Sequence, residues 1–497
     1  MEYTSLKKYI RRYSFDSKMA MCFRRSCMLY PRMREKDPAK IRNDVIPDEL
    51  ETLAMFSVYY DEWTARLNKF SDAEYIKVIN AVRNVKNPRL WKNGADELFA
   101  ERAFPSMAAN QFWWQESSHS LYYRFYSYFG TVTQNLDMPQ LFKQTFGMDY
   151  DRFLKFAWTL ETIIYSLSME GHRDQFSPRD DDLLFKSCIF HYRDVVLNLS
   201  KTRDGQRKII NDRISDDYDL AICIRPFVTY PFVEYQGSYY LPICYAVIPA
   251  TSTALMHRIT DKNSSVKNTL HEVYEKYLFD IVKGSGQFDE VYSEQVYGKE
   301  NKRTLDVLAR KDDIYVLFDS KSFTPKIDLR IYDDAARESD IKRVAEGIVQ
   351  VYKQITQEFG NHYDPFKHGE INLDRVYGIL VEQVDSYILS DNYFDLAAKM
   401  LGIDVDSSEY DWLCHHVAVA DMNKIEGFFF TSTSLIKELE LSKNERHVYF
   451  NKQETRKKYT YQPLDDFKNK IQQEMMIDLQ DIVKVFPHKS IEIEEKE

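Results

Sequence analysis

The chain has 497 residues, and 67 Lys and Arg against 77 Asp and Glu give it a formal net charge of −10. Hydrophobic residues make up 44% and charged residues 29%, which excludes a disordered or collagen-like chain and predicts two or three globular domains at this length. No apolar run approaches the roughly 18 residues that a membrane-spanning helix needs, no signal-peptide core is present, and six scattered cysteines without a zinc-like pair favour a reducing cytoplasm.

Helical periodicity dominates the first part of the chain. The clearest case is one apolar face formed by Phe153, Phe156, Leu160, Ile163 and Leu167. We therefore expect a helical N-terminal domain over residues 1–215. The charged run 179–182, which follows a proline, is expected to be an exposed loop.

The pattern changes near residue 216, where strand-like segments appear. They alternate with three expected helices, which is typical of an α/β domain. We expect this domain over residues 216–440, followed by a basic and then acidic helical segment over 441–497. The strands are expected at 221–228, 231–241, 288–296, 304–309, 314–320, 376–384 and 416–420, and the helices at 266–282, 338–358 and 393–400.

The most informative segment is a β-hairpin expected over residues 304–321. Side chains alternate along a strand, so Asp319 and Lys321 share one face. A turn of two or four residues places Asp306 opposite Leu317 and on that same face, whereas a register shift of one residue would move it to the other. Charges at the end of a buried strand are unfavourable unless they are paired or bind a metal, so the trio predicts a functional site.

The residue types of this trio indicate a class of chemistry. Carboxylate oxygens are the ligands that Mg²⁺ or Mn²⁺ prefers, and such an ion can polarise a phosphate and lower the pKa of a bound water. A lysine beside it can position that water or balance developing charge. The hairpin therefore fits phosphodiester hydrolysis, while the alternative is a structural Asp–Lys pair at the end of a strand.

The order of these elements resembles the PD-(D/E)XK nuclease superfamily. A helix with Tyr274-Glu275-Lys276-Tyr277-Leu278 comes first, then a strand with Asp306, then a strand with Asp319-Ser320-Lys321, and then another helix. The resemblance implies a restriction-endonuclease-like α/β/α domain with a mixed central sheet. Leu305 stands where the superfamily's name has a proline, and Asp319 stands where Glu is more usual.

The resemblance also implies residue roles. Asp306, Asp319 and Glu275 would be metal ligands, together with the backbone carbonyl of Ser320. Lys321 would be the catalytic lysine, and Gln350 would lie near the site. Glu272 competes with Glu275 for the place of the helix ligand.

The implied function is Mg²⁺- or Mn²⁺-dependent cleavage of nucleic acid, with DNA as the expected substrate, similar to bacterial restriction or anti-phage defence effectors. An RNase that uses the same site, and a nucleic-acid-binding or scaffold protein with a degenerate nuclease fold, are the alternatives. The basic stretch 443–458 is expected near the DNA, and both a homo-oligomer and a separate sensor or ATPase partner are left open. Cys414-His415-His416 has metal-binding residue types, but in the expected strand adjacent side chains point to opposite faces, so we expect no shared metal.

Overall fold

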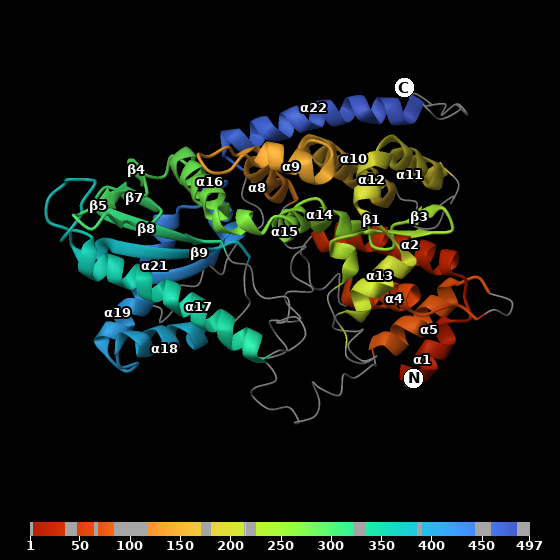
Figure 1. Ribbon diagram of the computed structural model, residues 1–497, viewed down its shortest axis with the longest axis horizontal. Helices are drawn as coiled ribbons and strands as arrows, with labels where there is room; N and C mark the ends of the chain where they lie inside the picture. Colours follow the sequence, from red (N-terminus) through yellow and green to blue (C-terminus); the bar gives the residue numbers. More distant parts are fainter. Residues whose placement is uncertain are drawn as a thin grey trace, which may run out of the picture.

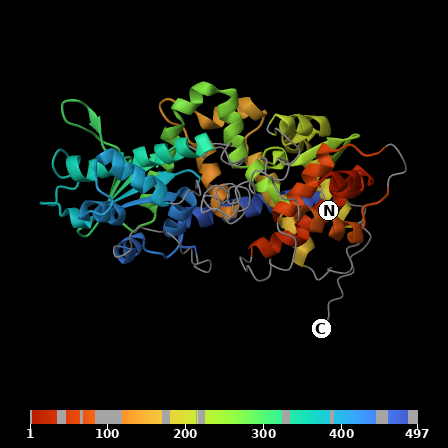
Figure 2. The ribbon, with the colours of Figure 1, turned by 90° about the horizontal axis from the view of Figure 1, so that it is seen from below.

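The computed structural model describes residues 3–34, 47–63, 68–83, 118–169, 180–212, 214, 225–322, 334–384, 390–442 and 459–484. Within these ranges the protein is a mixture of helices and mixed sheets, as the sequence predicts. N-terminal helices occupy one end of the long axis and the largest sheet lies at the other (Figures 1 and 2). No helix in the described ranges is long and apolar enough to span a membrane.

The described part of residues 1–215 is helical apart from one short strand, β1 (Ser200–Thr202). The loop expected at 179–182 is wrong for residues 180–182, which begin helix α11. The physical reason is that acidic residue types are favourable in the first turn of a helix. The helices of this part are α1 (Tyr3–Ile10), α2 (Phe15–Arg34), α4 (Pro47–Tyr59), α5 (Asp72–Arg83), α8 (Ser118–Gly130), α9 (Met138–Phe146), α10 (Tyr150–Met169), α11 (Asp180–His191), α12 (Arg193–Asn198) and α13 (Arg203–Asn211).

A small sheet joins this helical part to the residues that follow it. Strand β1 pairs in parallel with β2 (Phe232–Tyr235), which forms a hairpin with β3 (Ser238–Tyr240) around a turn at Gln236 and Gly237. Of the strand expected at 221–228, the structure describes residues 225–228, and there the expectation is wrong because Pro226–Val228 forms a 3₁₀ turn. Pro226 lacks an N–H and therefore disfavours a central strand. The β1–β2 pairing crosses residue 215, the expected domain boundary, and the boundary itself stays a prediction.

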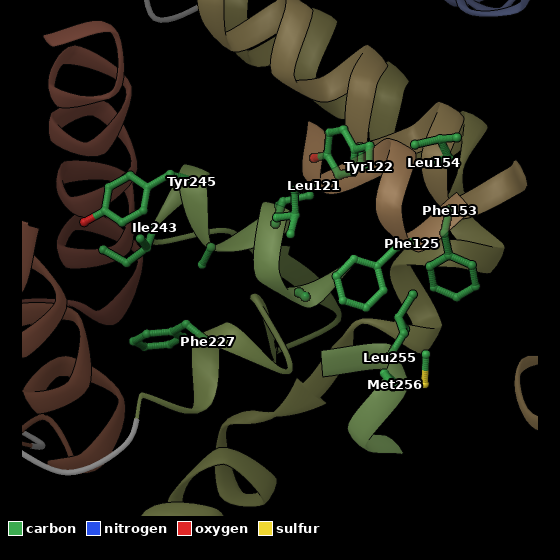
Figure 3. Packing of buried hydrophobic residues seen from close by; sticks show 14 of the residues in the cluster. Leu121, Tyr122, Phe125, Phe153, Leu154, Phe227, Ile243, Tyr245, Leu255 and Met256 are labelled. Carbon is green, nitrogen blue, oxygen red and sulfur yellow. The ribbon is translucent and has the colours of Figure 1, made fainter. Parts of the chain in front are cut away.

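Apolar side chains from several elements pack together in the helical part (Figure 3). Phe125 of α8 and Phe153 of α10 lie beside Leu255, and Phe227 and Tyr245 lie on the other side of the cluster. The same core continues to one face of the largest sheet. The elements between the two sheets are η4 (Cys244–Ala246), α14 (Val247–Ala250), α15 (Thr253–Lys262), η5 (Ser264–Asn268) and α16 (Leu270–Gly284).

Five of the described strands form the largest sheet, in the order β10-β9-β8-β7-β4. Strand β7 runs antiparallel to both of its neighbours, β4 and β8, whereas β8, β9 and β10 run parallel to one another. All residues of β9 and nearly all of β8 are buried, as expected for strands covered on both faces. The strands are β4 (Glu290–Ser293), β7 (Val307–Lys311), β8 (Ile314–Lys321), β9 (Val376–Glu382) and β10 (Val417–Asp421), with a separate hairpin of β5 (Val296–Tyr297) and β6 (Lys302–Arg303).

Helices cover both faces of this sheet (Figure 1). Apolar residues of α16 pack on the face that carries Val316 and Phe318, and those of α17 (Asp334–Lys353) pack on the face that carries Leu317. A β-carbon at Gly378 of β9 would lie 2.2 Å from Val351 Cγ1 of α17, so the glycine permits this close approach. The helix α17 continues into a π-helical turn, η7 (Gln354–Glu358), and a 3₁₀ turn, η8 (Leu373–Arg375), precedes β9.

The remaining helices complete the layers and connect the two ends of the molecule. Cys414, His415 and His416 all lie in helix α19, and the strand expected from residue 416 begins at Val417. The argument that adjacent side chains of a strand point to opposite faces therefore does not apply to these three residues. The long α22 extends from the sheet side across α8 and α10 (Figure 1). These helices are α18 (Ser390–Leu401), α19 (Ser408–His416), α20 (Met422–Phe429), α21 (Leu435–Ser442) and α22 (Gln462–Lys484).

Candidate active site

The expected hairpin is present as β7 and β8, with a tight turn at Asp312 and Asp313. Asp312 has a φ of 54°, in the left-handed region that two-residue hairpin turns require. The last pair of the ladder is Val307 with Phe318, so the same register extended by one residue puts Asp306 opposite Asp319 and not opposite Leu317. A register difference of two residues keeps a side chain on the same face of the sheet. Leu317 was therefore the wrong neighbour for Asp306, but the face expected for Asp306 was correct.

Direct contacts bring Asp306, Asp319 and Lys321 together at the C-terminal end of β8. The backbone N–H of Ser320 donates to Asp306 Oδ2 at 2.6 Å. Lys321 Nζ lies 2.7 Å from Asp319 Oδ2. Asp306 is only 9% exposed and Asp319 only 2%, whereas the side chain of Lys321 is 28% exposed. The two carboxylates are therefore almost inaccessible to water, whereas the neighbouring lysine is partly exposed to solvent.

Burial perturbs both carboxyl groups. It raises the pKa of Asp306 well above the usual range, and the negative charges of Asp319 and Glu275 raise it further. Burial also raises the pKa of Asp319, although the Lys321 ammonium acts in the opposite direction. A cluster of acids whose charge is incompletely compensated is characteristic of functional sites.

The structure distinguishes the two candidate helix acids. Glu272 accepts a hydrogen bond from Asn135 Nδ2 at 2.6 Å, and hydrogen bonds from the Thr133–Asn135 loop lower its pKa. Burial raises the pKa of Glu275, and the charges of Glu294 and Asp319 contribute to that increase. Of the two acids, Glu275 on α16 is therefore the one in the electrostatic environment of Asp319.

Gln350 of α17 contacts the candidate lysine. Although Gln350 is exposed, its Oε1 accepts a hydrogen bond from Lys321 Nζ at 2.9 Å. Lys321 is thus held between the Asp319 carboxylate on its own strand and an amide from the covering helix. Gln350 thus lies beside the candidate lysine, while its role in catalysis stays a prediction.

Two acidic residues at this edge of the sheet were missed by the sequence analysis. Glu294, directly after β4, raises the pKa of Asp319 and pairs with Arg303 at 2.8 Å. Glu382 is buried at the end of β9, where it is the register partner of Lys321. Both acids end a strand of the same sheet, and a search for charges at strand ends would have found them. The basic stretch 443–458 lies outside the described residues.

A divalent cation fits the two aspartates better than the full expected ligand set. Within the described ranges no three His, Cys, Asp or Glu side chains are grouped closely enough to hold a metal ion. Mg²⁺ in phosphoryl-transfer sites commonly takes one or two protein carboxylates and completes its shell with water and substrate oxygens. Among the described residues Asp319 Oδ2 receives no well-directed hydrogen bond despite the nearby ammonium, and burial disfavours the charged forms of both aspartates and so raises their pKa values. The donor chemistry thus fits a hard cation at Asp306 and Asp319, with Glu275 outside direct coordination in this arrangement.

Comparison with known proteins identifies no relative for this chain. No family model matches it, no curated protein matches its sequence, and no solved structure matches its fold. The conclusions about function therefore depend on the residues and contacts described above.

Proposed function

We propose that this chain is a metal-dependent nuclease that hydrolyses phosphodiester bonds of nucleic acid, with DNA as the favoured substrate. The observation that carries the proposal is the meeting of two buried aspartates, Asp306 and Asp319, with Lys321 at one edge of a mixed sheet. Two adjacent carboxylates that can hold a divalent cation, together with a neighbouring lysine, are the groups that metal-assisted hydrolysis of a phosphodiester uses.

Each residue of the site has a distinct role in this proposal. A divalent cation held by Asp306 and Asp319 would polarise a phosphate oxygen and lower the pKa of a bound water. The Ser320 N–H orients the Asp306 carboxylate, which leaves its other oxygen for the cation. The Lys321 ammonium, oriented by Asp319 and Gln350, can donate a hydrogen bond to the attacking water or to a phosphate oxygen.

The order of elements supports the resemblance to PD-(D/E)XK nucleases. Helix α16 with Glu275 comes first, then three antiparallel strands that include β7 and β8, then α17 and the parallel strand β9. We further propose, by analogy alone, a restriction or anti-phage setting, in which the helical part recruits or restrains the nuclease.

A second candidate is a binding or scaffold protein that retains the fold without activity. The observation in its favour is the ion pair between Lys321 and Asp319, which would also form in a purely structural site. The presence of both aspartates, the lysine and Gln350 at one edge of the sheet, with Lys321 in contact with Asp319 and Gln350, favours the enzyme.

A cleavage assay with the full chain tests the proposal. Supercoiled plasmid, single-stranded DNA and RNA are each incubated with Mg²⁺, Mn²⁺ or EDTA, with Asp319→Asn as the matched inactive variant. We expect cleavage with a divalent cation, none with EDTA, and none by the variant. Equal cleavage by wild type and Asp319→Asn would indicate a contaminating nuclease, and no cleavage of any substrate would favour the scaffold.

A further inference from the structure

A cavity of about 350 Å³ lies where the helical part meets the C-terminal ends of β8 and β9. Its walls include α8, α15, α16 and α17, together with Ser322 and Gln383. Ser322 directly follows Lys321, and Gln383 directly follows Glu382, the register partner of Lys321. The cavity is therefore adjacent to the candidate active site.

The walls combine positive charge with apolar surface. Lys267 and Arg343 line the cavity together with Asp261, and Arg343 also pairs with the buried Asp340 at 3.5 Å. The charge of Arg124, which lines the cavity as well, is neutralised by the buried Glu426. The apolar part of the lining includes Met256, Leu270, Tyr274 and Val384. Cations that can hold a phosphate beside apolar surface that can cover a base are the combination that single-stranded nucleic-acid sites use.

Gln383 provides a second, independent indication of a ligand. The side chain is only 6% exposed, and its Oε1 accepts a hydrogen bond from Tyr128 at 2.6 Å. This bond fixes the amide, and its Nε2 is buried without a hydrogen-bond partner among the described residues. A buried donor without an acceptor is unfavourable, so an oxygen of a phosphate or of a base at the cavity wall would satisfy it.

We propose that the cavity holds one nucleotide of a nucleic-acid strand next to the phosphate that is cleaved, so that the substrate is single-stranded or unstacked at that position. The inference rests on the proposed nuclease function and adds the form of its substrate. A volume of about 350 Å³ is at the small end of the roughly 300–1,000 Å³ of ligand sites. It has room for one nucleotide and none for a duplex, so a paired base would have to leave the helix to enter.

Binding measurements without metal test this proposal apart from the chemistry. Fluorescein-labelled single-stranded DNA and RNA, and blunt duplex DNA of the same sequence, are titrated in EDTA into the full-length Asp319→Asn protein over a series of salt concentrations. Arg343→Gln and Lys267→Gln are added to this background, and Lys342→Gln is the matched control. Lys342 neighbours Arg343 on α17, but its side chain is 64% exposed and does not line the cavity. Melting curves check that each variant is folded.

We expect tighter binding of a single strand than of the duplex. Each cavity variant should weaken single-strand binding and reduce the slope of log K against log salt by about 0.7 in magnitude, because one phosphate contact is lost. Lys342→Gln should leave both quantities unchanged. Folded cavity variants with the affinity and slope of the parent protein would overturn the proposal, as would preferential binding of the blunt duplex.

Competition by 2′-deoxyadenosine 5′-monophosphate distinguishes a strand from a free nucleotide. Weak competition supports a strand, whereas binding as tight as that of the oligonucleotide would assign the cavity to a free nucleotide and overturn the proposal. If the wild type cleaves but the cavity variants bind as the parent protein does, the cavity is rejected as a nucleotide site and the nuclease proposal stands. Variant-sensitive binding without any cleavage would reject the proposed chemistry and leave the cavity as a binding site.

Discussion

Asp306 and Asp319 place two carboxylates in a nearly dry environment, where the Lys321 ammonium is in direct contact with Asp319. The folded state therefore holds protons on these acids more tightly than the unfolded chain does, since burial raises both pKa values. Their contribution to stability is fully present below the ordinary Asp pKa of about 3.9 and is lost as the pH rises through the folded-state values. In the absence of metal, the site should destabilise the fold at neutral pH.

Asp306→Asn tests this linkage. In EDTA at pH 7, the variant should have a higher free energy of unfolding than wild type, because it removes one of two repelling charges while its amide oxygen can still accept from Ser320. The gain should shrink as the pH falls toward about 4. Urea unfolding of both proteins between about pH 4 and 7 measures this gain in the free energy of unfolding. The control is Asp280→Asn at an exposed position, which should change stability by no more than about 0.5 kcal/mol. A variant that is less stable than wild type at pH 7 would show that Asp306 forms a favourable structural interaction.

Gln350 is expected to act through Lys321. Gln350→Ala removes the acceptor at 2.9 Å from Lys321 Nζ, so the ammonium loses one of the two groups that orient it. We expect cleavage to slow by about 10- to 100-fold with little change in substrate KM, since a small misplacement of a catalytic group is costly. Gln350→Glu, which keeps an oxygen for the lysine, should restore part of the rate.

The control for this variant is Gln357→Ala, an exposed glutamine further along the same helical segment. It should cleave at the wild-type rate. Equal loss in both variants, or no rescue by Gln350→Glu, would mean that Gln350 supports the helix and not the lysine.

Sequence reasoning located these residues but not all of their neighbours. The two-residue period of a strand was sufficient to place Asp306, Asp319 and Lys321 on one face, because a register error of two residues leaves the face unchanged. Glu294 and Glu382 were missed because each belongs to a strand whose place in the sheet follows from tertiary pairing. A local pattern can mark an acid at the end of a strand, but it cannot show that this acid lies beside Asp319 or Lys321.

At the scale of the elements, the position of α17 on the sheet determines where Gln350 lies. The helix approaches β9 closely, since Gly378 faces Val351 and Ile355, and Gly347 faces Leu380. A methyl group at Gly378 would have its carbon 2.2 Å from Val351 Cγ1, so the helix would have to move away. The close approach of α17 to β9 therefore contributes to core packing and also positions Gln350 beside Lys321.

Gly378→Ala should reduce the free energy of unfolding by about 1–3 kcal/mol, the usual effect of overpacking a core. It should also lower the cleavage rate, because a displaced α17 moves Gln350 away from Lys321. Urea unfolding and the cleavage assay provide the two readouts. The control is Gly130→Ala at the end of α8, where a β-carbon would meet no atom within 4 Å. Unchanged stability in Gly378→Ala would contradict the packing argument.

The amphipathic helices and buried strands of the sheet region were predictable because their apolar periods are long and regular. The strand expected at 221–228 failed at Pro226, where the backbone lacks a donor, and the one expected at 416–420 begins a residue late because α19 includes His416. Both errors lie where a short apolar run fits a strand or a helix equally well.

At the scale of the whole molecule, a buried ion pair connects the helical part to the sheet region. Arg124 of α8 donates to both carboxylate oxygens of Glu426 of α20, at 2.6 and 2.8 Å, and Tyr277 donates to the same carboxylate at 2.7 Å. Neighbouring Tyr128 donates to Gln383 at the cavity. Helix α8 therefore contacts both the core and the edge of the candidate site, which composition and periodicity did not indicate.

Arg124→Met should destabilise the protein by about 3–5 kcal/mol, because it leaves the buried Glu426 carboxylate without its cation. The double variant Arg124→Met/Glu426→Gln removes that charge and keeps an acceptor for Tyr277, so it should recover much of the loss. Urea unfolding of the single and double variants measures the difference. Lys276→Ala, in an exposed pair with Asp280, should cost at most about 0.5 kcal/mol. No recovery in the double variant would contradict a charge-based explanation.

The central claim is that Asp306, Asp319 and Lys321 form one metal-dependent active site, and the cleavage rate of Lys321→Ala relative to wild type tests it most directly. With Mg²⁺ or Mn²⁺, we expect wild type to cleave and Lys321→Ala to be about 10²–10³-fold slower, as for the loss of one donor to a developing charge. The variant should remain folded and still bind the cation, because the lysine is not a ligand. A wild type that cleaves no nucleic acid with either metal, together with a Lys321→Ala variant that loses stability, would contradict the claim and leave a structural ion pair.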